Sequence, residues 1–483
     1  MAKQPKVPNE RRSNSLRNRL LLIPALAFLI KLTIIARIQG FDWYASGNGD
    51  LALGLRTLLD KNYVPGKVWY GADAENYLRS WLGLLNDGFF STEGKLHYWP
   101  AGYPLLIWII GLIGQGSTLA LIAIVQSFIY FVACAFFVDQ IRQTRLVTFS
   151  FPIAFGLTLN PTLALNTMAI GYELPTTSLM LVAISCMIRY FRLQKSSIIS
   201  RDTLLAFLSF ALTVFMQPRF LLLALATAMI WAFARFSIKK AATFVALGIV
   251  ISIVGPGVLV YRNSEAMGFL AISTNLGVTM NIGAGDEATG GYSPNSKGVA
   301  CPTAVGNAAQ ADRALVKCVL DWYSNNPDKA LKLFWNKAIY FWSPWYGPLK
   351  SGTMERNPWR VNHPLNETVK TQSGTNLVYG SIGKLISWLW LVAGLFFLVF
   401  GFRYLWQAGG LERLWGTAAF TLVVVNWLSS IVTIGDHRFR IPTMTLSLAL
   451  QVIGFTSLFL SKRKRLVGPG TDIGWPGLHW KRK

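Results

Sequence analysis

Charged residues are scarce in this sequence, and acidic residues are the scarcest. Only 14% of the 483 residues are charged, with 22 acidic side chains against 46 basic ones, whereas 52% are hydrophobic. Hydrophobic runs of about 20 residues recur along most of the chain, and each is long enough to cross a bilayer. The alternation that is typical of a membrane barrel is absent. Because backbone polar groups in hydrocarbon must be satisfied internally, we expect an all-α, polytopic helical membrane protein.

The sequence also lacks the signatures of several other protein classes. No phosphate-cradling loop or dinucleotide fingerprint is present, which argues against direct use of ATP or of a nucleotide sugar. The four histidines are scattered, and no spacing of cysteine, histidine and carboxylate residues matches a metal site. A divalent cation stays open as an assisting cofactor. No internal repeat is visible, which disfavours a transporter built from repeated halves.

Hydrophobicity assigns ten helical spans, and short runs near Pro218 put the total at about 10–12. The expected spans are residues 20–39, 118–138, 147–163, 174–191, 203–217, 219–236, 241–261, 383–403, 413–433 and 442–461. No small-residue cleavage site follows the first run, so we interpret it as a retained span. Pro161, Pro218 and Pro442 are expected at turns or helix ends. Residues 103–114 are apolar but too short for a full crossing, so we expect a partial or re-entrant helix there.

Basic residues flank the spans. The net charge of +24 would favour nucleic acid as the partner of a soluble protein, but six basic groups lie in the first 19 residues and seven in the last 22. Further basic segments lie at residues 139–145, 189–201 and 235–240. This pattern is typical of cytoplasmic flanks, and it also attracts anionic lipid head groups. We therefore expect these segments in the cytoplasm, and no nucleic-acid partner.

This topology divides the chain into tails, a membrane domain and two outer regions. The expected parts are a basic cytoplasmic tail (1–19), a membrane domain (20–461) with outer regions at 41–102 and 262–382, and a second basic tail (462–483). Residues 77–85 are amphipathic and suit a helix at the membrane interface. In the second region we expect helices at residues 312–323 and 328–341 and a glycine-rich loop at 281–291.

Asp73 is the acidic residue that most attracts a functional interpretation. It lies in a polar stretch, residues 71–77, just after the first span. Asp73 can simply cap the helix that starts at Ala74. It can also act as a general base at a wet cavity, where a carboxylate takes a proton from a hydroxyl. Glu75 and Tyr77 in the same stretch are candidates for binding a sugar or an acceptor.

Aromatic residues follow at the end of the first outer region. Tyr98, Trp99 and Tyr103 can form an interfacial aromatic belt, or a platform on which a pyranose ring stacks. Lys95 and His97, just before them, can contact an anion. We count all five as candidate substrate-binding residues.

Ionisable residues at the ends of spans are the remaining candidates. Glu173 begins a span, where an acid is favoured by the helix dipole, but ionisable groups at membrane depth are also functional candidates. Arg219 follows Pro218 at an outer turn and can help bind phosphate. Lys31 lies inside the first span and can snorkel to the interface.

Two arginines precede the last span. Pro442 favours an extended Ile441. If the preceding few residues are extended as well, Arg438 and Arg440 point to the same side of the chain. Two guanidinium groups on one side would clamp a phosphate, with His437 beside them. The alternative is that both arginines snorkel to anionic head groups.

The four cysteines fall into two pairs. Cys134 and Cys186 lie in hydrophobic runs and are expected to be packing residues. Cys301 and Cys318 share the second outer region. They can form a disulfide if that region is extracytoplasmic, or remain as two free thiols.

The order of these motifs resembles a known family. The matching segments are residues 71–77, 98–104, 160–161 with Glu173, 273–277 to 288–292, and 438–442. Together they resemble the bacterial branch of the protein O-mannosyltransferase and aminoarabinose-transferase-like enzymes (glycosyltransferase families 39 and 83), within the integral-membrane C-type (GT-C) glycosyltransferases. The chain departs from many relatives in carrying Trp99 where they have lysine, and in placing Arg219 after Pro218 rather than before it.

The resemblance implies a membrane enzyme of cell-envelope biogenesis that transfers a hexosyl or pentosyl group. The donor would be a sugar on a polyprenyl phosphate, and the acceptor a glycan, lipid or protein on the periplasmic face of a bacterial inner membrane. It implies inversion in a single displacement. By motif position, Asp73 would be the base, Arg438 and Arg440 would bind the phosphate, and Glu173 would be a second acid. A lipid-linked-sugar flippase and a polysaccharide polymerase or ligase are the alternatives.

Overall fold

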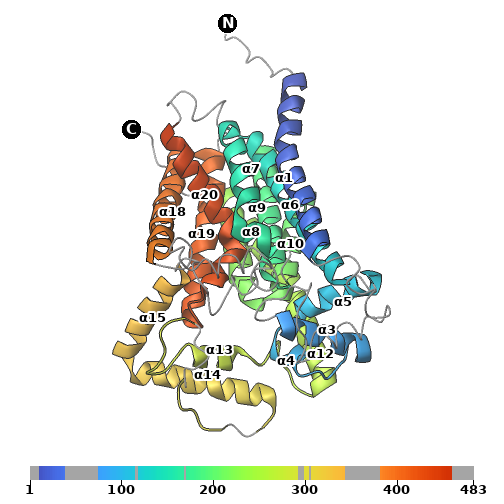
Figure 1. Ribbon diagram of the computed structural model, residues 1–483, viewed down its shortest axis with the longest axis vertical. Coiled ribbons are helices and arrows are strands. Elements are labelled where there is room, and N and C mark those ends of the chain that lie inside the picture. The colour runs from blue at the N-terminus through green and yellow to red at the C-terminus, as the bar shows by residue number, and fades with distance from the viewer. Residues whose placement is uncertain are drawn as a thin grey trace.

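A computed structural model describes residues 10–38, 74–114, 118–167, 170–291, 298–303, 306–342 and 381–459. The regular structure of these residues is entirely helical (Figure 1), as the hydrophobic pattern predicts. The long helices form a bundle, and the helices of both expected outer regions gather at one end of it. Asp73 lies outside the described residues, and the structure describes the helical backbone of Glu75 but not its side chain.

The bundle contains ten of the described helices. They are α1 (Glu10–Ile38), α6 (Thr118–Arg142), α7 (Ser150–Leu159), α9 (Glu173–Arg192), α10 (Arg201–Met216), α11 (Leu221–Arg235), α12 (Ile238–Met267), α18 (Ser381–Ala408), α19 (Gly410–Val432) and α20 (Ile441–Phe459). Each overlaps one predicted span. Seven candidate spans in the described part are long and apolar enough to cross a membrane. The chain is therefore an integral membrane protein.

Ten further helices complete the described chain. They are α3 (Ala74–Asp87), α4 (Lys95–Tyr98), α5 (Gly102–Gly114), η4 (Val147–Phe149), α8 (Pro161–Asn166), η5 (Pro218–Phe220), α13 (Leu276–Ile282), α14 (Ala308–Asn325), α15 (Pro327–Phe341) and η7 (His437–Arg440). Helices α14 and α15 confirm the two helices predicted in the second outer region. Helix α5 has 13 residues, so at about 1.5 Å per residue it is shorter than the hydrocarbon core is thick.

The predicted span at residues 147–163 is interrupted, so its continuity was wrong. Helix α7 ends at Leu159, and Asn160 is extended with ψ 118°. The cause is Pro161, which disfavours a helical conformation in the residue before it. The side-chain oxygen of Asn160 then accepts a hydrogen bond from the amide of Leu163 at 3.0 Å and caps the next helix.

The bundle is held by buried aromatic residues and by close helix crossings. The largest fully buried side chains include Trp81, Trp231 and Trp415. Helices α18 and α20 cross at Gly401 and Gly454. A Cβ at either position would lie 1.9 Å or 2.1 Å from a carbonyl oxygen of the other helix. Small residues let the two backbones approach this closely, which is a common way to pack helices in a membrane.

The two ends of the bundle carry different connections. At the basic end, the Arg145 guanidinium donates to Glu412 at 3.1 Å and so ties the α6–α7 turn to the start of α19. At the other end, the two outer regions are joined. The amide of Thr274 donates to the carbonyl of His97 at 2.9 Å, and buried Arg262 donates to the carbonyl of Phe89 at 3.0 Å. One connected assembly therefore forms at this end of the bundle, which we call the outer end because it holds both predicted outer regions (Figure 1). It consists of α3, α4, α13, α14 and α15.

Candidate functional site

A cavity of about 810 Å³ lies at this outer end. Its wall combines the start of α3, helix α4 and the residues after it, η5, the segment from residue 270 into α13, part of α14, and the turn before α20. The predicted site residues on this wall are Tyr77, Lys95, Tyr98, Trp99, Arg219 and Arg438. Segments that are far apart in the sequence thus bring six of the predicted residues to one cavity.

Two arginines share one aromatic ring in this wall. The guanidinium carbon of Arg219 lies 4.1 Å from the centre of the Phe439 ring, and that of Arg438 lies 5.3 Å from it. Nε and Nη2 of Arg219 have no hydrogen-bond partner among the described residues, although both atoms are buried from solvent. A guanidinium group held by ring stacking keeps its donors available for an anion.

The sequence around Pro218 explains the position of Arg219. Helix α10 ends at Met216, and Gln217 is extended with φ −149° and ψ 97° because a proline follows it. Pro218 then starts the short helix η5, where its missing amide hydrogen costs nothing. Tyr172, on the same wall, hydrogen-bonds Gln217, and burial raises the pKa of the Tyr172 hydroxyl. The tyrosine therefore stays a neutral hydroxyl beside the arginine.

Asp436 and a glycine turn fix Arg438. The Asp436 carboxylate accepts the amide of Arg438 at 2.9 Å, and its second oxygen lies 3.5 Å from the Arg438 Nε. The preceding Gly435 donates to the carbonyl of Gly290 at 2.9 Å. A Cβ on Gly435 would lie 2.2 Å from the carbonyl oxygen of Lys337. Helix α15 therefore packs directly on the turn that carries Arg438.

The predicted extended conformation of this turn is wrong. Residues His437–Arg440 form a 3₁₀ helix, and Ile441 is helical with φ −53° and ψ −45°. Pro442 lies in the first turn of α20, where a proline fits without breaking the helix. Arg440 consequently does not line the cavity: it is buried and donates to the carbonyl of Trp342 at 3.1 Å. The arginine that shares the Phe439 ring with Arg438 is Arg219.

Lys95, Tyr98 and Trp99 make an aromatic part of the wall. The Lys95 ammonium lies 5.1 Å from the centre of the Tyr98 ring, and the Tyr98 and Trp99 rings meet edge to face at 5.4 Å. The indole Nε1 of Trp99 is buried without a hydrogen-bond partner among the described residues. Aromatic rings with polar tips can hold a ligand that has both apolar faces and hydroxyl groups.

His97, Tyr103 and Glu173 are predicted residues that lie off the cavity wall. His97 packs edge to face on Phe269 at 5.7 Å, and burial together with Arg262 lowers the pKa of its imidazole, so it is neutral near pH 7. The hydroxyl of Tyr103 donates to Gln126 at 2.9 Å inside the bundle. Glu173 is 2% exposed at the start of α9. These positions favour packing roles for His97 and Tyr103.

Three predicted residues have side chains that the structure does not place. Asp73 precedes the first described residue of α3, Ala74, and the side chains of Glu75 and His437 are not described. Asn76 and Tyr77, in the first turn of α3, line the cavity. Roles for the three remain predictions.

Lys31 is buried in α1, with its ammonium 4.7 Å from the Tyr130 ring centre.

Several lining residues were not predicted as site residues. Tyr172, Gln217, Asn275, Asp312 and Arg313 all lie on the wall. Asn275 belongs to a motif that contributes to the family resemblance, so a signal was present there. Asp312 and Arg313 look like ordinary surface positions of an amphipathic helix, and only the packing of α14 against α13 brings them to the cavity.

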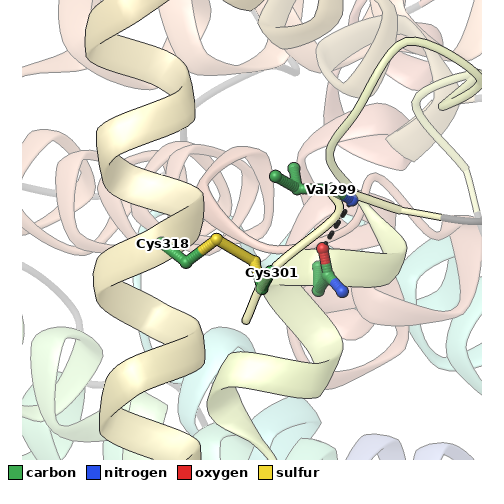
Figure 2. Close-up of a disulfide and its surroundings, with 4 residues drawn as sticks. Val299, Cys301 and Cys318 are labelled. Atoms are coloured by element: carbon green, nitrogen blue, oxygen red, sulfur yellow. Dashed lines mark hydrogen bonds between the residues drawn. A yellow bond between two sulfur atoms is a disulfide. The ribbon is translucent and has the colours of Figure 1, made fainter. Parts of the chain in front are cut away.

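A disulfide joins Cys301 to Cys318 of α14, with the two Cα atoms 6.0 Å apart (Figure 2). Two residues before Cys301, the amide of Val299 donates to the side chain of Asn281 at 2.7 Å. Asn281 belongs to α13, so the short segment 298–303 connects α13 and α14. Cys134 and Cys186 are buried free thiols. Within the described residues no group of three or more histidine, cysteine or acidic side chains could hold a metal ion.

Comparison with known proteins gives matches among solved structures. No protein-family model matches the sequence. No curated protein matches it either. Two similar structures are of the oligosaccharyltransferase of Archaeoglobus fulgidus. The apo crystal structure is 15% identical with a TM-score of 0.45, and the complex with an inhibitory peptide and a dolichol-phosphate is 13% identical with a TM-score of 0.41. Each match covers 89% of this chain and 50% of the other, so this chain spans about half their length.

Proposed function

We propose that this protein is a C-type membrane glycosyltransferase that moves a sugar from a polyprenyl phosphate to an acceptor on the outer face of the membrane. The observation that carries the proposal is the convergence of Arg219 and Arg438 on Phe439, in a cavity that aromatic and hydroxyl-bearing residues also line. Guanidinium groups bind phosphate through paired, charge-assisted hydrogen bonds, so two of them side by side suit a phosphate ester. The order of the sequence motifs supports the same class.

The location of the cavity supports a lipid-linked substrate. The cavity lies at the end of the bundle that carries the outer regions, whereas the basic loops lie at the opposite end. With the basic loops in the cytoplasm, the cavity faces the periplasm of a bacterial inner membrane. A donor whose phosphate and sugar lie at the lipid–water boundary reaches such a cavity while its polyprenyl chain stays in the bilayer.

The proposed reaction is a single displacement. The acceptor hydroxyl oxygen attacks the anomeric carbon, and the bond from that carbon to the phosphate oxygen breaks with its electron pair on the phosphate. Arg219 and Arg438 stabilise the charge that develops on the leaving phosphate. The acceptor proton passes to a carboxylate, and Asp73 is the residue we assign to that step. The configuration of the transferred sugar inverts.

The experiment that tests this function compares cell-envelope glycans by mass spectrometry in cells with and without the gene. We expect a product that lacks one glycosyl residue in the deletion strain, with the intact product restored by the wild-type gene. Purified protein in lipid nanodiscs should transfer that sugar from its lipid donor to the acceptor. Transport of the lipid-linked sugar without any transfer would overturn the proposal in favour of a flippase.

A further inference from the structure

Besides the arginines, side chains that can accept hydrogen bonds line the cavity. The segment before and within α13 contributes Ser273, Asn275 and Thr279, and α14 contributes Asp312. These side chains offer hydroxyl, amide and carboxylate groups. In Figure 1, α13 and α14 lie at the far outer end of the molecule, beyond the ends of α19 and α20. The outer helices thus add acceptor groups to the cavity. Arg313, next to Asp312 on α14, also lines it and donates to the carbonyl of Leu270 at 3.1 Å.

The carboxylate of Asp312 is held in place by its neighbours. Its Oδ1 accepts the amide of Gly277 at 2.7 Å, which joins α14 to the start of α13. Gly277 has no room for a side chain, because a Cβ there would lie 2.5 Å from the Asp312 carbonyl oxygen. Helix α14 is further fixed by the capping box between Asn307 and Gln310. One oxygen of Asp312 is therefore used by the backbone, while the residue still lines the cavity.

A fixed carboxylate in a largely apolar cavity suits recognition of a hydroxyl group. Burial raises the pKa of Asp312, while the hydrogen bond from the Gly277 amide lowers it. Asp312 is half-buried, and an acceptor shielded from water favours a ligand that brings a hydroxyl donor over one that leaves the acceptor unpaired. The glycosyl group of the proposed donor is attached directly to the phosphate, so it occupies the same cavity as the arginines.

We propose that Asp312 is a specificity-determining residue, whose carboxylate accepts a hydrogen bond from a hydroxyl group of the sugar on the donor lipid. The assignment rests on the proposed function. It divides donor recognition between two parts of the cavity: Arg219 and Arg438 bind the phosphate whatever it carries, and Asp312 distinguishes a loaded donor from the bare lipid phosphate. Tyr98 and Trp99 can then pack on the apolar face of the same sugar.

The test measures binding of undecaprenyl phosphate and of synthetic undecaprenyl phosphates that carry glucose, mannose, galactose or arabinose. The protein is used as the full chain in nanodiscs. Wild type should bind at least one loaded lipid more tightly than the bare lipid. Asp312→Asn keeps an oxygen for the Gly277 amide and should lose that preference by about 10-fold or more, with the affinity for bare lipid unchanged. Asp321→Asn, an exposed acid on the same helix, should match wild type.

The outcomes separate this inference from the proposed function. If no loaded lipid binds wild type better than the bare lipid, or if Asp312→Asn keeps the full preference, the inference is overturned while the phosphate site stands. Failure of wild type to bind bare undecaprenyl phosphate would instead contradict the proposed function. If Asp312→Asn lowers the melting temperature and both affinities equally, its role is structural and the inference is again wrong.

Discussion

Arg145 at the basic end of the bundle and Arg219 at the outer end use their charges in opposite ways. At the basic end, Arg145 forms an ion pair with Glu412, and Lys195 forms one with Asp202. At the outer end, Arg219 faces a cavity with Nε and Nη2 unpartnered among the described residues. Desolvating a cation without an anion is costly, so such a group persists where a ligand supplies the anion. Charge at the basic end therefore joins helices, and we propose that the charge of Arg219 binds substrate.

The largest predicted effect is the loss of sugar transfer when Asp73, the proposed base at the outer end, is replaced. Asp73→Asn should lower the rate of sugar transfer by about 10²- to 10⁴-fold, because the acceptor proton then has no base to receive it. Folding and donor binding should be retained. The measurement is single-turnover transfer by purified protein in nanodiscs, with Asp87→Asn at the exposed end of α3 as the matched control. A transfer rate near that of wild type would remove Asp73 from the mechanism.

The next prediction compares how much stability is lost when one charge is removed at each end. Glu412→Gln leaves Arg145 without its carboxylate and should cost about 3 kcal/mol of stability, the lower end of the range for breaking a buried pair, since Arg145 is partly exposed. Arg219→Gln should cost much less, about 1 kcal/mol, because Arg219 has no carboxylate partner and loses only its stacking on Phe439. Thermal melting of both variants in the same detergent measures the difference. Equal losses would abolish the distinction between the two ends.

The sequence predicts the helices and the turns between them, but not the contacts between distant segments that complete the cavity. Span hydrophobicity located all ten bundle helices, and the basic segments identified the end opposite the cavity. Arg219 and Arg438 were also predicted, because prolines next to span ends mark turns. The predicted pairing of Arg438 with Arg440 was wrong, since Ile441 is helical and Pro442 lies in the first turn of α20. Asp312 could not be found, because tertiary packing of α13 against α14 alone brings it to the cavity.

A third prediction concerns the outer helices. Replacing Cys301 and Cys318 together with serine should destabilise the α13–α14 unit by about 3 kcal/mol, because the disulfide closes a loop of 17 residues in the unfolded chain. Hydrogen exchange should quicken in α13 and α14 and stay unchanged in α9 and α20. Donor affinity should fall as well, since both helices line the cavity. Unchanged exchange in α13 would show that the disulfide does not support the wall.

A further prediction is a pH dependence at α15. Lys337 is fully buried with its ammonium 2.9 Å from the Tyr323 hydroxyl, and burial lowers its pKa to about 7 from 10.5. Between these two values the unfolded chain binds a proton that the folded protein does not, so stability should rise as pH increases from 7 to 10.5. Lys337→Met should flatten this rise. Melting curves across that pH range measure it, with exposed Lys332→Met as control.

Binding of undecaprenyl phosphate is the most direct test of whether Arg219 and Arg438 hold the phosphate of the donor lipid. We expect Arg219→Gln and Arg438→Gln each to weaken this binding by about 10-fold or more, because each loses a charge-assisted contact to phosphate. Arg201→Gln, an exposed arginine at the basic end, should bind like wild type. Wild-type affinity in both cavity variants would contradict the account, since it would show that the paired arginines on Phe439 do not hold the lipid phosphate.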